Sequence, residues 1–417
     1  MTTTSQAGIR NYLLVTLAYW AFTITDGAIH MLVVLHFHNL GFKPLDIAFL
    51  FLFYEVFGII TNGVGGYIGA RLGLNTTMFL GMVLQILALT MLAVDPSWLS
   101  IPYIMSFMAL SGIAKDLNKM SAKSSVKLMV PDGEESDSRL FKMVALLTGS
   151  KNSLKGAGFF LGGLLLALWG FQIALLTLAG GLLITMILTS WLLPKEMGKA
   201  KSSLKFKQLF SKTPQINRLS AARFFLFGSR DVWFTVALPV FFAEQLGWSH
   251  TQVGTFLALW VVGYGVVQAI APGLLRGKQK DHGPDGRTAQ LWAFLLILFP
   301  AGIALALTQG FNPATAIVVG LGLFGAVFAI NSSVHSFLIL LYSDRDTVAM
   351  NVGFYYMANA AGRLTGTVLS GGVYQLYGLQ GCLWTSVAFI TAAALISMTL
   401  PDHNKWQEIR QKIAPAD

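Results

Sequence analysis

The sequence predicts an all-α membrane protein in which twelve transmembrane helices form two pseudo-symmetric six-helix bundles. Three observations lead to this fold class. Of the 417 residues, 54% are hydrophobic and only 12% are charged, against about 25% charged in a typical soluble domain. Apolar runs of roughly 18 or more residues recur along the chain, and each is long enough to cross a bilayer. Segments of the first half also recur in the second half.

Each expected span is an apolar run of about 20 residues, because an α-helix rises 1.5 Å per residue and the hydrocarbon core is about 30 Å thick. The spans of the first half are expected at 12–37, 45–69, 76–94, 100–122, 141–168 and 171–193. Those of the second half are expected at 219–242, 250–275, 289–308, 313–341, 347–376 and 380–400.

The basic residues fall in alternate connections between these spans. Of the 29 Lys and Arg, only Lys43 lies in a predicted external connection. The positive-inside rule therefore places both termini in the cytoplasm. The net charge of +10 reflects this orientation, so it does not point to nucleic acid. The opening residues carry no cleavage pattern, so the first apolar run is expected to be a retained helix and the protein a multi-pass inner-membrane protein.

Internal repeats define the domain organisation. LGFKPLDIA at 40–48 matches LGWSHTQVG at 246–254, and KSSVK at 123–127 matches NSSVH at 331–335. The stretch 155–170 likewise matches 363–378. A six-helix unit duplicated in the same orientation explains these matches. The predicted domains are an N-terminal bundle at 1–194, a basic cytoplasmic linker at 195–215 and a C-terminal bundle at 216–417.

This arrangement resembles the major facilitator superfamily. Its signature loop, G-x-x-x-D-R-x-G, appears as Gly66, Arg71 and Gly73, but Ala70 stands where the acid is expected. The superfamily resemblance therefore depends on the span count, the duplication and the charge distribution. The missing acid puts the usual cytoplasmic gate contact in doubt.

Basic residues inside the spans are the best indicators of function, because an ionisable group at bilayer depth costs about 2.5–3.5 kcal/mol on insertion scales. Counting residues from the outer helix ends places Lys115, Lys155, Arg230 and Arg363 at similar depth. We expect these cations to be uncompensated and to bind substrate. For Arg230 the alternative is a pair with neighbouring Asp231 or with another helix.

Other polar residues have weaker assignments. Lys119 is a further candidate for substrate binding, although it and Lys151 lie close enough to the interface to snorkel. Lys123 and Lys127 are interpreted as cytoplasmic anchors. Neutral donors to the substrate are expected from two helices, with ordinary helix–helix hydrogen bonding as the alternative: Asn331, Ser332, Ser333, His335, Asn351, Tyr355, Tyr356 and Asn359.

Intramembrane acids are fewer, and they are candidates for proton coupling. Asp26 lies four residues before His30, so the two share a helical face, as a proton relay requires. The alternative is a structural pair. Glu55 is expected in mid-span, where it either titrates or neutralises a lysine. Asp116 completes the set of proton-coupling candidates.

A cluster of buried cations predicts a small polyanionic substrate, because arginine binds phosphate, arsenate or carboxylate oxygens bidentately and lysine acts as a point charge. With the cell interior negative, an anion leaves the cell downhill, so export needs less coupling than import, and proton antiport would add to the drive. The single cysteine, Cys382, excludes a disulfide and a multi-thiolate metal site within one chain. No cofactor is expected.

Three stretches resemble the organoarsenical efflux permeases of bacterial arsenic-resistance operons (ArsJ type). They are the opening NYLLVTLAYWAFTITDGAIHMLVVLHFHNLGFKPLDIAFLFLFYEVFGIITN, LSGIAKDLNKMSAKSSVKLMVP and GFYYMANAAGRLTG. The resemblance implies export of 1-arseno-3-phosphoglycerate across a bacterial inner membrane, which confers arsenate resistance. It also implies a partner glyceraldehyde-3-phosphate dehydrogenase that makes this ester from arsenate. We expect the permease to be a monomer.

Other functions were weighed. The first alternative is a facilitator-type transporter of another small organic or phosphorylated anion, with proton-coupled import as one form. A membrane-embedded enzyme is disfavoured, because the sequence has no metal-ligand cluster, no G-x-S-x-G and no phosphate-binding loop. A sensor would need a sizeable soluble output domain, and the linker is too short for one.

Overall fold

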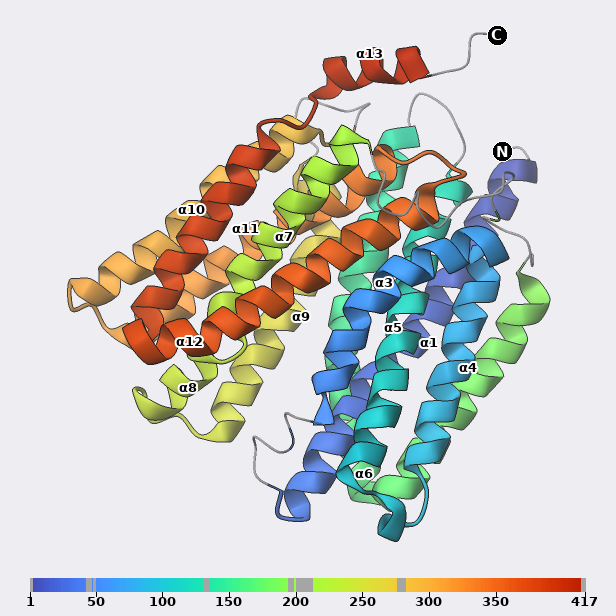
Figure 1. Cartoon of the computed structure of the whole chain (residues 1–417), viewed down its shortest axis with the longest axis vertical. Coiled ribbons are helices and arrows are strands. Elements are labelled where there is room, and N and C mark those ends of the chain that lie inside the picture. The colour runs from blue at the N-terminus through green and yellow to red at the C-terminus, as the bar shows by residue number, and fades with distance from the viewer. Residues whose placement is uncertain are drawn as a thin grey trace. The chain divides into compact units, whose positions relative to one another are not determined.

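The computed structural model describes residues 3–42, 47, 50–130, 136–193, 199, 213–275 and 283–413, and these residues are almost entirely helical. Lys43 and nearly all of the predicted linker at 195–215 lie outside the described residues. Figure 1 shows the helices in chain order. Cα packing divides the chain into two compact units. The first unit contains residues 1–136, 150–211 and 343–357, and the second contains 137–149, 212–342 and 358–417.

The first unit is built from α1 (Thr3–Asn39), α3 (Leu52–Leu72), α4 (Leu74–Leu92), α5 (Ile101–Met129) and most of α6 (Ser136–Leu192). The short 3-10 helix η1 (Pro96–Trp98) joins α4 to α5. In Figure 1, α1, α3, α4 and α5 run side by side. Their facing surfaces form one apolar core, to which each helix contributes a fully or nearly fully buried side chain: Ile29, Tyr54, Leu89, Met108 and Leu175.

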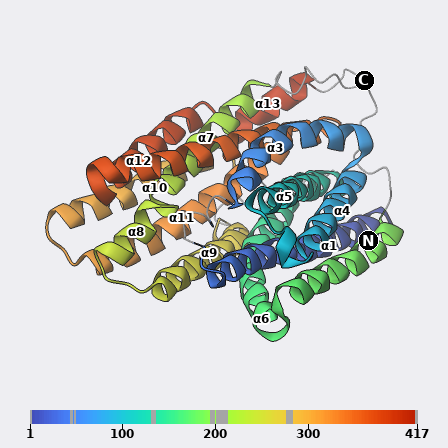
Figure 2. The same cartoon turned by 60° about the horizontal axis from the view of Figure 1, so that its bottom comes forward.

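The second unit is built from α7 (Pro214–Phe234), α8 (Ala237–Glu244), α9 (His250–Leu274), α10 (Gly286–Thr308), α11 (Pro313–Leu341), α12 (Val348–Ser397) and α13 (His403–Ile413). Figure 2 shows α7, α10 and α11 packed together. Its core is more aromatic than that of the first unit, with Trp233, Trp260 and Phe324 in edge-to-face contact. Such ring pairs are stabilising beyond their buried area.

Two glycines turn long helices back on themselves. Helix α6 has 57 residues and a non-helical Gly170 with φ 74°, and α12 has 50 residues and a non-helical Gly378 with φ 64°. A positive φ favours glycine, because other residues place Cβ against the backbone there. These helices would be roughly 85 and 75 Å long if straight, so each supplies two spans. The two glycines occupy matching positions in the sequence repeat.

Most predicted span boundaries agree with the helices to within about five residues. The exceptions are α1, which begins nine residues before the predicted start at 12, and α5, which ends seven residues after the predicted end at 122. The predicted span at 219–242 is divided between α7 and α8. The predicted start of the second span at 45 lies outside the described residues.

Within the described residues, eight segments are long and apolar enough to cross a membrane. Each of the two helices that contain a glycine turn is counted as one of these eight segments. Helix α5 is 29 residues long but carries five charged side chains. Twelve spans fit these helices, and that number stays a prediction.

The close approach of α1 and α6 gives a test of packing in the first unit. A Cβ on Gly158 would lie 2.6 Å from the Ile24 carbonyl oxygen and 3.1 Å from the Gly27 Cα. We expect Gly158→Ala to destabilise the protein by about 1–3 kcal/mol, because backbone atoms cannot yield as a flexible side chain does. Thermal unfolding in detergent measures this loss. Gly163→Ala is the matched control on the same helix, since its Cβ would meet only side-chain atoms at 3.7 Å or more. Equal melting temperatures for the two variants would contradict the packing argument.

Candidate functional site

Asp26 of α1 is the centre of a buried polar cluster in the first unit. Its carboxylate lies 3.2 Å from Lys155 Nζ of α6 and accepts a hydrogen bond of 2.6 Å from the Tyr54 hydroxyl of α3. His30 Nδ1 lies 2.7 Å from the Asp26 carbonyl oxygen and 4.0 Å from its carboxylate. Since a carbonyl only accepts, Nδ1 carries a proton. His30 is therefore hydrogen-bonded to the backbone of Asp26, and its predicted role in a relay stays a prediction.

Asp116 of α5 is shared by two lysines of the same helix. Lys119 Nζ forms a close ion pair with Asp116 Oδ1, and Lys115 Nζ lies 3.9 Å from Oδ2. Lys115 Nζ also lies 3.8 Å from the centroid of the Tyr54 ring, in a cation–π contact. Tyr54 therefore links the two acids, because its hydroxyl bonds Asp26 and its ring faces Lys115.

Lys123 is not the solvent-exposed anchor that the sequence indicated. Its side chain is buried, and its Nζ donates a hydrogen bond to the Tyr356 hydroxyl in the part of α12 that belongs to the first unit. Lys119 Nζ lies 4.6 Å from the centroid of the same ring. Tyr355 is buried next to it, with ring centroids 5.1 Å apart. The two tyrosines thus join the lysine face of α5.

The prediction of uncompensated cations is wrong. Lys115, Lys155, Arg230 and Arg363 each have a carboxylate oxygen within 3.9 Å. The acids are shared, because Asp116 contacts two lysines and Asp231 contacts two arginines. Lys151 lies within electrostatic range of the other three lysines of the first cluster, so four lysines surround Asp26 and Asp116. Glu55 lies in the first turn of α3 with an exposed side chain, and its predicted position in mid-span stays a prediction.

Asp231 of α7 organises the corresponding cluster in the second unit. Its side chain is fully buried between two arginines. Arg230 Nε lies 2.6 Å from Oδ1 and Arg363 Nε lies 2.9 Å from Oδ2. The alternative that the sequence left open for Arg230, a pair with its neighbour, is what the structure shows. Arg363 keeps 38% of its side chain exposed, so it is available to a ligand.

The two ion pairs occupy related positions in the repeat. Lys155 of α6 and Arg363 of α12 are 208 residues apart, and Asp26 of α1 and Asp231 of α7 are 205 residues apart. In each unit the acid lies on the first long helix and the base on the helix that ends at the glycine turn. The duplication therefore includes the polar pair as well as the backbone.

Arg223 is a polar residue of the second unit that the sequence analysis missed. It is 3% exposed on α7, its Nε donates to Asn359 Oδ1 at 2.8 Å, and its Nη1 donates to the Ser332 hydroxyl oxygen at 3.1 Å. It is only the fifth residue of the predicted span 219–242, close to the end where arginine is ordinary. The signal that was available is an arginine inside the apolar run AARFFLF, seven residues before Arg230.

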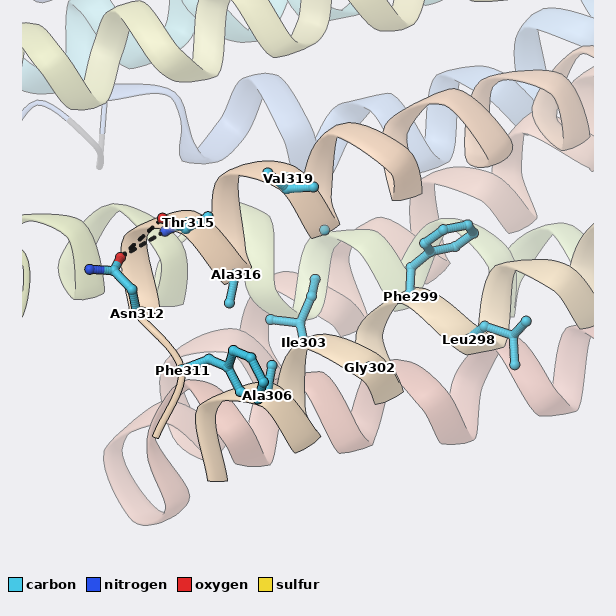
Figure 3. A pocket seen from close by; sticks show the side chains of 11 residues that line it. Leu298, Phe299, Gly302, Ile303, Ala306, Phe311, Asn312, Thr315, Ala316 and Val319 are labelled. Carbon is cyan, nitrogen blue, oxygen red and sulfur yellow. Dashed lines mark hydrogen bonds between the residues drawn. The ribbon is translucent and has the colours of Figure 1, made fainter. Parts of the chain in front are cut away.

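A cavity of about 420 Å³ lies between α10 and α11 (Figure 3), away from these charges. Apolar side chains such as Leu298, Phe299 and Ile303 line it, with Asn312 and Thr315 hydrogen-bonded to each other at one end. Leu298 and Phe311 are among the most exposed side chains of the unit, as expected of a lipid-facing groove. The predicted substrate-binding residues are not part of its lining.

Comparison with known proteins agrees with this description. The family model of the Major Facilitator Superfamily matches residues 12–233 and 219–415. Because this match covers nearly the whole chain, the protein is a secondary carrier of small substrates, and not an enzyme. The chain belongs to the major facilitator superfamily. No curated protein sequence matches it significantly.

Several solved structures share the fold at low sequence identity. The human organic anion transporter MFSD10 is 16% identical, with a TM-score of 0.72 over 95% of this chain and 100% of that one. The proton:xylose symporter XylE is 13% identical, with a TM-score of 0.72 over 96% and 99%. A bacterial homologue of the iron transporter ferroportin is 15% identical, with a TM-score of 0.74 over 95% and 99%. Their substrates differ, so the fold alone does not select one.

Removal of the shared acid tests the second cluster. We expect Asp231→Asn to destabilise the protein by on the order of 3 kcal/mol, because it leaves Arg230 and Arg363 close together with no shared carboxylate. The value is at the low end for breaking a buried pair, since Arg363 is partly solvated. The double variant Asp231→Asn/Arg363→Gln should recover part of the loss, which a double-mutant cycle of melting temperatures measures. Strictly additive losses would show that the two residues are not coupled.

Proposed function

We propose that this carrier exports a small anionic organoarsenical, 1-arseno-3-phosphoglycerate, from the cytoplasm and so confers arsenate resistance. The observation that carries the proposal is that, among the described residues of each unit, partly buried bases outnumber the buried acids that they contact. Lys115, Lys119, Lys151 and Lys155 surround two carboxylates. Arg223, Arg230 and Arg363 accompany Asp231. A residual positive charge in a low-dielectric environment attracts a polyanion strongly.

The form of arsenic follows from the donor chemistry. Trivalent arsenic binds several thiolates, whereas pentavalent arsenic is an oxyanion that lysine and arginine bind as they bind phosphate. The chain has one cysteine, Cys382, buried in the core of the second unit. The arsenylated ester carries an arsenate and a phosphate but no positive charge, so it suits a cationic site. The resemblance of the sequence to organoarsenical permeases points to the same substrate.

The proposal includes a cellular setting. The substrate is supplied by glyceraldehyde-3-phosphate dehydrogenase acting on arsenate, and the carrier is a monomer in a bacterial inner membrane with both termini in the cytoplasm. Its two six-helix halves, 1–194 and 216–417, exchange access between the two sides of the membrane, as in other carriers built from repeats. Export of an anion is driven by the negative cell interior, at about 2.3 kcal/mol per charge for 100 mV.

The alternative is transport of another organic or phosphorylated anion, with proton-coupled import as one form. The contacts of Asp26 support it, because an acid held by Tyr54 and Lys155 next to His30 has the composition of a proton site. An organic anion transporter and a proton:sugar symporter both have this fold. A gene for the dehydrogenase next to the gene for this carrier would favour the organoarsenical over the alternative.

Uptake into inverted membrane vesicles tests the substrate and the binding residues together. The ester is generated in place by the dehydrogenase from glyceraldehyde 3-phosphate, NAD+ and arsenate, and uptake into the vesicles is compared with that after addition of plain arsenate or 3-phosphoglycerate. We expect the ester to be preferred. Lys155→Ala and Arg363→Ala should each reduce uptake about tenfold or more, since a hydrogen bond to a charged group contributes about 1.5–3 kcal/mol.

Lys142→Ala is the matched control, because Lys142 is exposed on the same helix as Lys155; its uptake and its membrane insertion should equal those of the wild type. Normal uptake by both Lys155→Ala and Arg363→Ala would remove the site assignment while leaving the substrate intact. Wild-type vesicles that ignore the ester but accumulate 3-phosphoglycerate would replace the proposed substrate with the alternative.

The membrane potential separates export from coupled import. For a doubly anionic substrate, 100 mV is worth roughly 4.6 kcal/mol. We expect a lumen-positive potassium diffusion potential, which reproduces the cellular sign in inverted vesicles, to increase initial uptake several-fold without any pH gradient. Uptake that follows a pH gradient and ignores the potential would instead favour proton-coupled transport.

A further inference from the structure

Helix α7 carries two arginines on one face, with an aromatic ring between them. Arg223 and Arg230 are seven residues apart, about 10.5 Å along the helix axis. The Phe227 ring lies between them, with its centroid 3.8 Å from the Arg223 guanidinium carbon and 5.2 Å from that of Arg230. The spacings of four and three residues place all three side chains on the same helical face.

The arginines have different surroundings. Arg230 shares Asp231 with Arg363, whereas the contacts of Arg223 with Asn359 and Ser332 are to neutral oxygens. Arg223 donates through Nε and Nη1, and these bonds fix the plane of its guanidinium. A guanidinium of fixed orientation is suited to an oxyanion, because the directions of its remaining N–H donors are already set.

Two buried side chains close to Arg223 lack hydrogen-bond partners among the described residues. They are His335, at both ring nitrogens, and Asn331, at both amide atoms. Four residues separate them, and His335 follows Ser332, the partner of Arg223, by three, so the three lie next to one another on α11. Arg223 acts electrostatically on His335. Buried polar groups in proteins are normally paired, so unpaired groups beside a buried arginine indicate a ligand.

We propose that Arg223, His335 and Asn331 form a second oxyanion site, which binds one end of a substrate whose other anionic group lies at Arg230 and Arg363. Arg223 and Arg230 would then measure the separation of the two groups, and the carrier would prefer molecules with an oxyanion at each end of a short carbon chain to simple inorganic anions. This inference deepens the proposed function and rests on the carrier binding anions.

A purely structural role for Arg223 would be to tether α7 to α11 and α12 through Ser332 and Asn359. The two roles predict different values for the ratio of the affinities for an anion with two charged ends and a simple inorganic anion. A tether affects the binding of every anion alike, because it acts through the stability of the unit. A second site affects only ligands that have a second anionic group.

The test measures binding of 3-phosphoglycerate and of orthophosphate to the purified carrier by isothermal titration calorimetry. We expect the wild type to bind 3-phosphoglycerate about tenfold or more tightly than orthophosphate, as one additional charge-assisted contact implies. Arg223→Gln should bring this ratio close to one and change orthophosphate binding by less than about threefold. Arg223→Lys should give an intermediate ratio, because the charge remains and the fork is lost.

His335→Gln is a second variant that leaves the Arg223 contacts in place, and it should lower the ratio in the same direction. The control is Arg218→Gln on the same helix, since Arg218 is exposed and donates to the Thr399 carbonyl; its ratio should equal that of the wild type. The second site would be contradicted if Arg223→Gln lost affinity for 3-phosphoglycerate and orthophosphate equally, or if the wild type bound the two equally well. Neither result would contradict anion transport. A wild type that binds neither anion would contradict the proposed function itself.

Discussion

Asp116 and Asp231 each lie between two bases, and this sharing of a buried acid is the interaction on which both polar clusters depend. A lone base inside a membrane protein is costly, and a fully paired one has no attraction left for a ligand. A carboxylate shared by two bases lies between these limits. It stabilises both side chains in the absence of substrate and leaves part of their charge available. The helices can therefore fold around the cluster and still bind an anion.

The two units use different residues to place bases around a shared buried acid. The pair between the first long helix and the helix with the glycine turn is common to both, as Asp26 with Lys155 and Asp231 with Arg363. The additional bases come from α5 in the first unit and from α7 in the second. Those of α5 are lysines, which act as mobile point charges, and those of α7 are arginines, which present fixed forks. The duplicated fold thus carries two kinds of basic side chain at its polar clusters.

The positions of most helices could be predicted from the sequence, but the side-chain contacts between them could not. Length and hydropathy predicted most boundaries to within a few residues, because the bilayer imposes them, and the glycine turns fall where the repeat predicts. Depth along a helix located Lys155 and Arg363, but a count at 1.5 Å per residue carries no information on which side chain faces which. Lys123 and Tyr356 are 233 residues apart, and only packing brings them together. Arg223 was missed for the same reason, since what distinguishes it is its burial against Asn359 and Ser332.

Shared acids also bear on release, which a carrier needs as much as binding. Every charge-assisted contact that tightens a polyanion also slows its departure, so a cluster of wholly unpaired bases would hold the ligand too firmly to pass it on. When the ligand leaves, Asp231 is already in contact with Arg230 and Arg363, so the bases return to a partner and not to an unpaired state. The contact between the acid and its bases lowers the affinity for the anion. The same contact lowers the free-energy cost of releasing the anion. Turnover of a highly charged substrate is therefore compatible with its recognition by several buried bases.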